Sequence, residues 1–522
     1  MSADKLASLK KQLFLISERE STDTPVVIGK DTLELLSISM YVDPMSIFRE
    51  YIQNATDSID EARRTGLFKP NDPGCISIDT NANDRTVKIR DNGFGLSHDY
   101  FENRLTSVGA SKKKGTNARG FRGVGRLAGL GYCQELIFRS RVAGSPNVSE
   151  LRWDCRKLRS LLRDDSFEGD LANVIRQTAT VRRLKDGDLP DRFFEVELVG
   201  IVRHRNDQLL NPIAIQEYLT EIAPIPFAPG FRYAAEITDA LSPHVKLGNI
   251  HIQLNGGSDP LYRPHRDAVE LGGGAIEQFS ELELLKVPAV DGEVAAVGWI
   301  LHHGYSGALP AAAGVKGLRV RSGNIQIGNG DLLQELFPEP RFNSWTVGEI
   351  HVLDPRIVPN GRRDHFEQNV HLFNLLNHLS PVAREISRRC RANSLRRQWL
   401  RDFERHSALV SAKVSILRQR ALGKIDRARV ADEIQQLLLL MERIAGQDKL
   451  DITTKADLST IIRGLRSSLT RSVQGTSRDS VLAHISPPKR RAYEQMIALI
   501  YECTPKQSDA KVLVDRIIAK LK

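Results

Sequence analysis

The chain has 522 residues, of which 41% are hydrophobic and 26% are charged, and this composition excludes a disordered or fibrous protein. A chain of this length is too long for one compact core, so we expect two to four domains. The formal net charge is +10, but residues 381–522 carry 29 Lys and Arg against 15 Asp and Glu, a net +14. Residues 1–380 therefore carry a net charge of −4. The basic C-terminal part is either a solvated helical surface or a surface that contacts a polyanion.

Cysteine usage and hydropathy indicate the cellular compartment in which the protein is expected. The five cysteines lie far apart and include no CxxC pair, which favours a reducing cytoplasm and argues against a cysteine-rich zinc site. They are Cys75, Cys133, Cys155, Cys390 and Cys503. The first 21 residues lack the pattern of a signal peptide, and no apolar run approaches the roughly 18 residues of a membrane span. We expect a cytoplasmic protein without a membrane span.

The first element of interest is a helix expected over residues 42–66, after a helical lead-in at residues 1–41. Asp43 can cap the start of the helix, and Pro44 suits its first position. Gly66 follows the last turn and marks the end. Apolar residues recur along the segment at helical spacing. One face of this helix is therefore expected to pack on a core.

A polar stripe runs along the same helix, because Glu50, Asn54 and Asp57 stand at positions i, i+4 and i+7. A carboxylate followed one turn later by a carboxamide can activate a water molecule and ligate Mg²⁺ through oxygen. Taken alone, a stripe of this kind is more often a solvated helix surface.

Two strand-like runs follow, at residues 75–79 and 86–90, and the turn residues between them predict an antiparallel pair. The second run ends in the sequence DNGFGL at residues 91–96. Two alternate glycines let the backbone turn sharply and approach a flat ligand closely. Asp91 can accept a hydrogen bond from an exocyclic amine such as that of adenine, although a DNG sequence is most often only a turn.

A glycine-rich segment, GFRGVG at residues 120–125, follows a basic run at residues 112–114. Glycines that open a helix present free N–H groups to an anion, but this segment matches neither the Walker A nor the Rossmann pattern. The remaining elements of a first domain over residues 1–230 are strand-like runs at 135–139, 148–153, 179–183 and 193–202, and a helix at 212–222.

The three segments occur in a fixed order, E-x-x-x-N-A-x-D, then D-N-G-x-G, then G-x-x-G-x-G, and this series resembles the GHKL superfamily of gyrase, heat-shock chaperones, histidine kinases and MutL. The resemblance covers about residues 25–230. It implies the Bergerat fold, an α/β sandwich with helices on one face of a mixed sheet. It also implies an ATPase that uses Mg²⁺ and works as a homodimer.

Roles for individual residues follow from this resemblance. Glu50 would be the general base that orients the attacking water, Asn54 the Mg²⁺ ligand, and Asp91 the residue that reads the adenine amino group. The other nucleotide-contacting positions would be Asp57, Gly93, Gly95, Leu96, Lys112, Gly120, Gly123, Val124 and Gly125, with a lid at Ser111–Gly120. One feature departs from the family: residues 193–198 lack the Gly-Thr pair that helps to hold adenine.

A second domain is expected over residues 231–380, an α+β domain of the transducer type with strands at 250–254, 293–301 and 317–321. Its sequence GEIHVLDPRIVPNGRRDHFE, at residues 348–367, resembles the catalytic loop of the ninety-kilodalton heat-shock chaperones. In that family an arginine of the loop reaches the γ-phosphate. The resemblance implies this role for Arg363, with Arg362 as the alternative, and a nucleotide contact for Asn360.

The third expected domain, residues 381–522, is all-α and basic, with helices at 384–430, 432–444, 491–501 and 511–521. The fold class is thus a multidomain α+β protein. The function favoured by the resemblance is a chaperone-like ATPase that clamps a protein client. The alternative is a MutL- or MORC-like ATPase that clamps nucleic acid in genome maintenance or defence.

Overall fold

The computed structural model describes residues 29–35, 43–69, 72–107, 125–167, 169–185, 187–204, 206–248, 250–272, 274–474 and 480–521. The chain divides into two compact units. The first comprises Met1–His302, Leu309–Leu336 and Thr346–Leu379, and the second comprises His303–Ala308, Phe337–Trp345 and Ser380–Lys522. Each unit contains its own clusters of buried apolar side chains.

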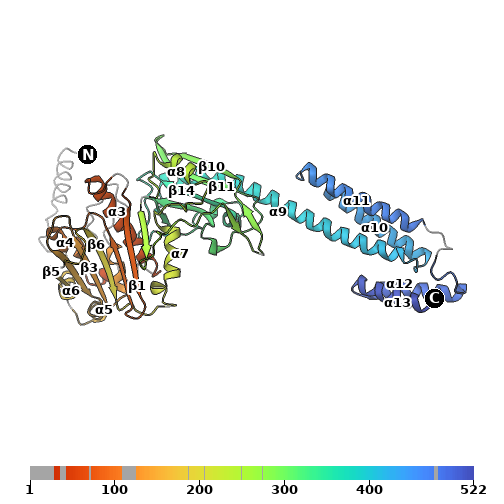
Figure 1. Cartoon of the computed structure of the whole chain (residues 1–522), viewed down its shortest axis with the longest axis horizontal. Coiled ribbons are helices and arrows are strands. Elements are labelled where there is room, and N and C mark those ends of the chain that lie inside the picture. Colours follow the sequence, from red (N-terminus) through yellow and green to blue (C-terminus); the bar gives the residue numbers. More distant parts are fainter. Residues whose placement is uncertain are drawn as a thin grey trace, which may run out of the picture. The chain divides into compact units, whose positions relative to one another are not determined.

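A seven-stranded mixed sheet forms the first part of the first unit, with strand order β5-β4-β3-β6-β2-β1-β7 (Figure 1). All neighbouring strands are antiparallel except β1 and β7, which are parallel. The strands are β1 (Gly74–Asn81), β2 (Thr86–Asp91), β3 (Glu135–Arg141), β4 (Val148–Asp154), β5 (Ala179–Leu184), β6 (Phe193–Val199) and β7 (Ile250–Leu254).

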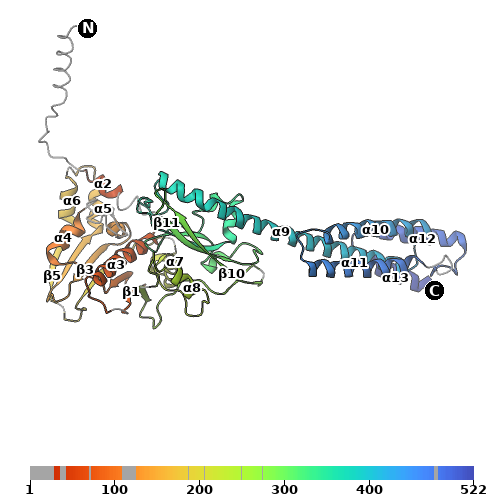
Figure 2. The same cartoon turned by 90° about the horizontal axis from the view of Figure 1, so that it is seen from above.

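Helices cover one face of this sheet, as Figure 2 shows for α3 to α6. The helices of the first unit before α9 are α2 (Asp31–Glu34), α3 (Ser46–Arg64), α4 (His98–Thr106), α5 (Cys155–Arg163), α6 (Leu171–Thr178), α7 (Pro212–Ile222) and α8 (Ala234–Leu241). Ion pairs also connect neighbouring strands: Arg139 of β3 pairs with Glu150 of β4 and with both Glu195 and Glu197 of β6. The predicted α/β sandwich is confirmed.

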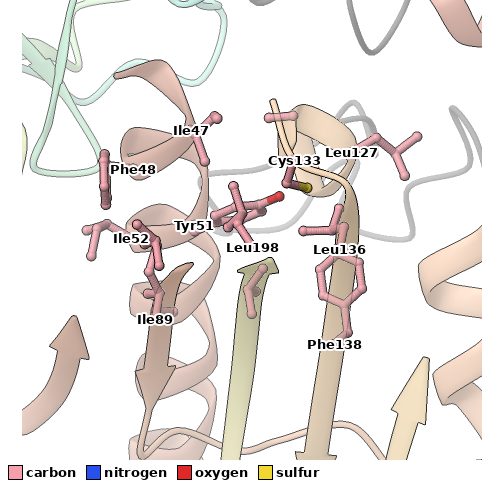
Figure 3. Close-up of a cluster of buried hydrophobic side chains, with 14 of the residues drawn as sticks. Ile47, Phe48, Tyr51, Ile52, Ile89, Leu127, Cys133, Leu136, Phe138 and Leu198 are labelled. Carbon is pink, nitrogen blue, oxygen red and sulfur yellow. The ribbon is translucent and has the colours of Figure 1, made fainter. Parts of the chain in front are cut away.

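The core beneath α3 explains why the residues of this segment form a helix. Figure 3 shows Tyr51 and Ile52 of α3 facing strand residues that include Ile89, Leu136 and Leu198. All of these side chains are buried, so the helix is held by its apolar face. α3 begins at Ser46 rather than at the predicted Pro44, and Gly66 follows its last turn with a φ of 76°, as expected.

The seven-stranded sheet extends beyond residue 230, where the first domain was expected to end. β7 lies in the predicted second domain, yet it pairs with β1 from Gly74↔Ile250 to Ile78↔Leu254. The pairing is parallel, so it requires a long connection along the chain, and α7 and α8 lie in that connection. The expected boundary at 230 therefore does not coincide with the limit of the first sheet.

A second sheet in the first unit has the order β10-β11-β14-β12-β13, and a separate pair joins β8 to β9. The strands are β8 (Ala268–Glu270), β9 (Ile276–Gln278), β10 (Glu281–Pro288), β11 (Val294–His302), β12 (Gly317–Ser322), β13 (Ile325–Ile327) and β14 (Val347–Val352). Short 3-10 helices occur at η2 (Gly125–Gly131), η3 (Gln208–Leu210), η4 (Ala311–Ala313), η5 (Gln334–Leu336) and η6 (Pro340–Trp345).

A buried polar network crosses the second sheet. Glu349 of β14 accepts from Arg321 of β12 at 2.7 Å and from Arg263, and all three side chains are at most 1% exposed. Arg263 also donates to the carbonyl of Ile225 at 2.9 Å. The network therefore ties the segment after α7 to the second sheet.

From residue 380 onward, the part of the second unit that the structure describes is built from helices, which confirms the all-α C-terminal region. Its helices are α9 (Val370–Arg418), which begins in the first unit, then α10 (Lys424–Ala445), α11 (Ile452–Val473), α12 (Pro487–Cys503) and α13 (Gln507–Leu521). The helix predicted over 384–430 ends at Arg418 instead, and α10 begins after an N-cap at Gly423. Within the described ranges, no helix has the length and apolar character needed to cross a membrane.

Candidate active site

The polar stripe of α3 is partly buried. Glu50 is 6% exposed, whereas Asn54 and Asp57 are half-buried on the same side of the helix. The stripe is thus not the solvated surface that its sequence alone favoured. Its three side chains present oxygen atoms along about two turns of α3.

Arg363 meets Glu50 at this stripe, although 312 residues separate them in the sequence. Arg363 Nε lies 2.9 Å from Glu50 Oε1, and the two side chains are 11% and 8% exposed. Arg362, the alternative candidate, is exposed. The loop after β14 therefore delivers one specific arginine to the carboxylate of α3.

The backbone around Arg363 is held in an uncommon conformation. Its φ is 56°, in the left-handed region that a residue other than glycine adopts at a cost of about 1–3 kcal/mol. The Arg363 carbonyl accepts from the Gly328 N–H at 2.8 Å, and an isolated β-bridge joins Pro359 to Phe366. These contacts maintain the loop in the shape that directs Arg363 toward Glu50.

Arg49, which the sequence did not single out, adds a second contact to this loop. Its Nη1 donates to the carbonyl of Arg363 at 3.1 Å, and its guanidinium lies 5.8 Å from the centre of the Tyr218 ring on α7. Arg49 is buried beside the predicted base. Nothing in its spacing distinguishes it from an ordinary charged helix residue, so only the fold reveals this role.

Asn360 lies in the same loop but is directed to the loop itself. Its Nδ2 donates to Asp364 Oδ1 at 2.6 Å, and its backbone N–H donates to the His365 carbonyl at 2.9 Å. These bonds close the turn that carries Arg363. Asn360 therefore supports the loop conformation, while its predicted contact with a nucleotide stays a prediction.

Asp91 lies at the end of β2 and is 3% exposed. Its Oδ1 accepts from the Gly93 N–H at 2.8 Å and from the Ser58 hydroxyl at 3.1 Å. Burial raises the pKa of Asp91 to about 7, although those two bonds and the charge of Arg192 each lower it. Ser58, which sequence reasoning missed, thus connects α3 to this carboxyl group.

The glycines of the DNGFGL turn allow the close backbone packing that was expected. A Cβ at Gly93 would lie 2.6 Å from Asp91 Oδ1, and Gly95 has a φ of 76° with the Arg141 carbonyl against it. The half-buried Leu96 is fixed through its backbone N–H, which donates to Ser140 Oγ at 2.7 Å. No side chain larger than hydrogen fits at either glycine.

Gly125, at the start of η2, brings backbone close to the predicted base. A Cβ at this position would collide with the Glu50 carboxylate. Tyr51 of α3 anchors η2 by two hydrogen bonds. Its hydroxyl donates to the Arg126 carbonyl at 3.2 Å and accepts from the Gly129 N–H at 3.0 Å. The predicted contacts Lys112, Gly120, Gly123 and Val124, and the lid at Ser111–Gly120, lie outside the described residues.

The side chains fit a nucleotide and a phosphate-bound metal. Asp91 offers a buried acceptor at the end of β2, while Glu50 of α3 and Arg363 of the loop after β14 form a charged pair. No group of three or more His, Cys, Asp or Glu that could hold a metal ion occurs among the described residues. Asn54 would therefore be one of few protein ligands, as is usual for Mg²⁺ that is bound mainly through phosphates and water.

Comparison with known proteins agrees with this geometry. The family described as "Histidine kinase-, DNA gyrase B-, and HSP90-like ATPase" matches residues 44–166. Proteins named "Chaperone protein HtpG" from Chromobacterium violaceum, Aromatoleum aromaticum and Fusobacterium nucleatum are 28%, 24% and 27% identical to this chain over 207, 205 and 184 residues. These matches cover 36%, 36% and 32% of this chain and 31%, 31% and 29% of the relatives. The chain thus spans about a third of the length of the curated relatives it matches.

Proposed function

We propose that this chain, whose residues 44–166 form a GHKL-type ATPase domain, binds and hydrolyses ATP to drive a conformational clamp on a protein client. The observation that carries this proposal is the 2.9 Å ion pair between Glu50 and Arg363. It joins a predicted base and a predicted phosphate-binding arginine that two separate sequence motifs contribute. Such a pair in one site supports phosphoryl chemistry, which depends on positioning and on charge stabilisation.

Glu50 acts in this proposal as the general base for the attacking water. In the ion pair, Arg363 occupies a Glu50 carboxylate oxygen, Oε1, that the attacking water would otherwise contact. Arg363 therefore has two positions, one on Glu50 and one on the transferred phosphoryl group, and its departure from Glu50 restores the base. Arg49 and Asn360 act as positioning residues, because they hold the loop that carries Arg363.

Asp91 recognises the base of the nucleotide, with its carboxylate accepting from the exocyclic amine. Gly93 and Gly95 shape the turn against which the flat ring lies, and Leu96 covers the ring. The phosphates bind at the glycine segment, with contacts from Gly120, Gly123, Val124, Gly125 and Lys112. Asp57 supports the polar side of the site.

Asn54 holds Mg²⁺ through its side-chain oxygen, and Mg²⁺ neutralises charge on the phosphates when it is bound. This assignment is supported by the position of Asn54 one turn after Glu50, at half-buried exposure.

The chaperone-like role is supported by relatives whose names identify them as chaperones. A protein client, a homodimer and a cytoplasmic location belong to this proposal. The five cysteines, all of them free, are compatible with a reducing compartment.

The decisive test is the Glu50→Ala variant. It should bind ATP within about threefold of the parent and lose turnover by a factor on the order of 10²–10⁴, because in this proposal Glu50 accepts the proton of the attacking water and does not bind the nucleotide. Glu61→Ala is the matched control, since Glu61 is a 42%-exposed carboxylate near the end of the same helix. Parent-like hydrolysis by Glu50→Ala would show that the general-base assignment is wrong.

A second candidate function, a MutL- or MORC-like clamp on nucleic acid, is favoured by the net +14 of residues 381–522. Arg463 and Arg471 of α11 are exposed and hydrogen-bond only to hydroxyl and carbonyl groups in the described contacts. Duplex DNA should then bind at low salt with an affinity that falls steeply as salt rises, and Arg463→Ser with Arg471→Ser should weaken it. Absence of binding at low salt would eliminate this candidate.

A further inference from the structure

A small cavity lies beside the turn between β3 and β4 and the start of α4. Its volume is about 200 Å³, below the roughly 300–1,000 Å³ of pockets that accept drug-sized ligands. Side chains from four separate places line it, among them His98 of α4, Arg141 of β3, Ser149 of β4 and Arg183 of β5. The cavity therefore suits a ligand of a few heavy atoms.

The charge of the lining selects the kind of ligand. Arg141 and Arg183 both line the cavity, and no Asp or Glu is among its lining residues. Arg141 is fixed there, because its Nη1 donates to the Leu189 carbonyl at 3.0 Å and the residue is 6% exposed. We propose that this cavity binds a small oxyanion of the phosphate or sulfate type.

The hydrogen bonds of His98 orient the donors that an oxyanion requires. Arg183 Nε donates to His98 Nε2 at 2.7 Å, so the imidazole carries its proton on Nδ1 and donates it to Ser149 Oγ at 3.0 Å. Ser149, which is 4% exposed, therefore keeps its own hydroxyl hydrogen for another acceptor. Among the described residues, Arg183 makes this bond through Nε, and its two terminal NH₂ groups can bind the oxyanion.

The other hydroxyl groups of the cavity serve the fold. Ser140 donates to the Phe193 carbonyl at 3.0 Å, and Ser145 donates to the Asn147 carbonyl at 3.1 Å. Recognition of an anion thus depends on Arg183 and Ser149, beside the wall that Arg141 forms. A bound oxyanion would exchange water for charge-assisted hydrogen bonds, which are the stronger kind.

The cavity is distinct from the nucleotide site, because neither Glu50 nor Asp91 lines it. Leu96 is common to both regions, since it lines the cavity and its N–H donates to Ser140. The proposal concerns a free oxyanion, and it does not depend on ATP hydrolysis. A phosphate group of a nucleotide is the rival source of the same chemistry.

The test measures thermal unfolding of the full chain against sulfate and against inorganic phosphate, with chloride keeping the ionic strength constant. The melting temperature should rise and saturate in the wild type, and the midpoint concentration should increase at least about tenfold in Arg183→Gln. Arg182→Gln is the matched control, because Arg182 precedes Arg183 on β5, is exposed and does not line the cavity. It should titrate like the wild type.

Repeating the titration with saturating ADP separates the two sources. The sulfate response should persist with ADP bound, and ADP affinity should be the same in Arg183→Gln as in the wild type. A wild-type melting temperature that does not respond to sulfate would overturn the proposal. So would an equal response in Arg183→Gln, or competition between ADP and sulfate. Ser149→Ala should give a smaller weakening, about threefold, because it removes one neutral donor.

Discussion

Two buried carboxylates of the first unit, Glu349 in the second sheet and Asp91 in the seven-stranded sheet, are satisfied in opposite ways. Glu349, in the second sheet, is paired with two guanidinium groups and accepts from His351 Nε2 at 3.3 Å. Although burial alone would raise the pKa of Glu349, the positive charges of Arg263 and Arg321 hold it well below its usual value. Asp91, at the end of β2, accepts through Oδ1 from two neutral donors, and burial raises its pKa to about 7.

The difference separates a carboxylate that serves the fold from one that is prepared for a ligand. Glu349 has its charge neutralised within the chain, so a ligand would gain little by contacting it. Asp91 bears the cost of burial without a cation in contact, and a donor from a ligand would reduce that cost. Perturbed carboxyl groups of this kind concentrate at functional sites.

The largest effect should come from Glu349→Gln. This change leaves Arg263 and Arg321 buried side by side without a counter-charge, and removing one partner of a buried ion pair costs about 3–5 kcal/mol. We expect the free energy of unfolding in urea to fall by that amount. Glu281→Gln, at an exposed position on β10, is the control and should change it by less than about 0.5 kcal/mol. Equal effects of Glu349→Gln and Glu281→Gln would contradict the conclusion that Glu349 serves the fold.

The next effect concerns Asp91→Asn. Loss of a charged acceptor should weaken ATP binding by about 10- to 150-fold, measured by calorimetry. The free energy of unfolding at pH 8 should stay the same or rise, because the variant no longer buries an ionised carboxyl group. A strongly destabilised variant would instead assign Asp91 to the fold, as for Glu349.

The smallest effect is a shift in pH dependence. Ionised Asp91 is the acceptor, so ATP affinity should fall as the pH drops through about 7. The free energy of unfolding depends on pH in the opposite direction. The raised pKa of Asp91 in the folded state stabilises the protein below about pH 4, and that contribution is lost as the pH rises to about 7.

The Ser58→Ala variant removes a hydrogen bond that lowers the pKa of Asp91. The pH midpoint of ATP binding should therefore move up, and the affinity for ATP at pH 7 should fall by about two- to fivefold. An unchanged midpoint would show that Ser58 does not tune Asp91.

Local patterns in the sequence were sufficient for α3 and for the turn after β2. The helical spacing of the apolar residues and the position of Gly66 predicted α3 to within two residues of its start. The DNGFGL sequence predicted a close backbone turn, and Gly95 with its positive φ is consistent with that. Both depend on neighbours in sequence, which is why they were visible.

Long-range contacts could not be predicted in the same way. The resemblance implied Arg363 with Arg362 as the alternative, whereas the orientation of Arg363 depends on its left-handed backbone and on its bond to Gly328. Nothing in the local sequence around Arg321 and Glu349 indicates that these charged strand residues are buried. Their burial follows from the order of strands in the sheet, which brings β12 beside β14. That order cannot be predicted from the sequence of either strand alone.

The parallel pairing of β7 with β1 determines where this chain can be cut. A fragment that stops at residue 230 would leave β1 as an uncovered edge, with unpaired N–H and C=O groups that can recruit another chain. Asn255, just after β7, reinforces the cover by accepting from the Thr80 N–H at 2.8 Å. An isolated nucleotide-binding fragment should therefore extend through Asn255 to remain dispersed, whereas the shorter one should aggregate.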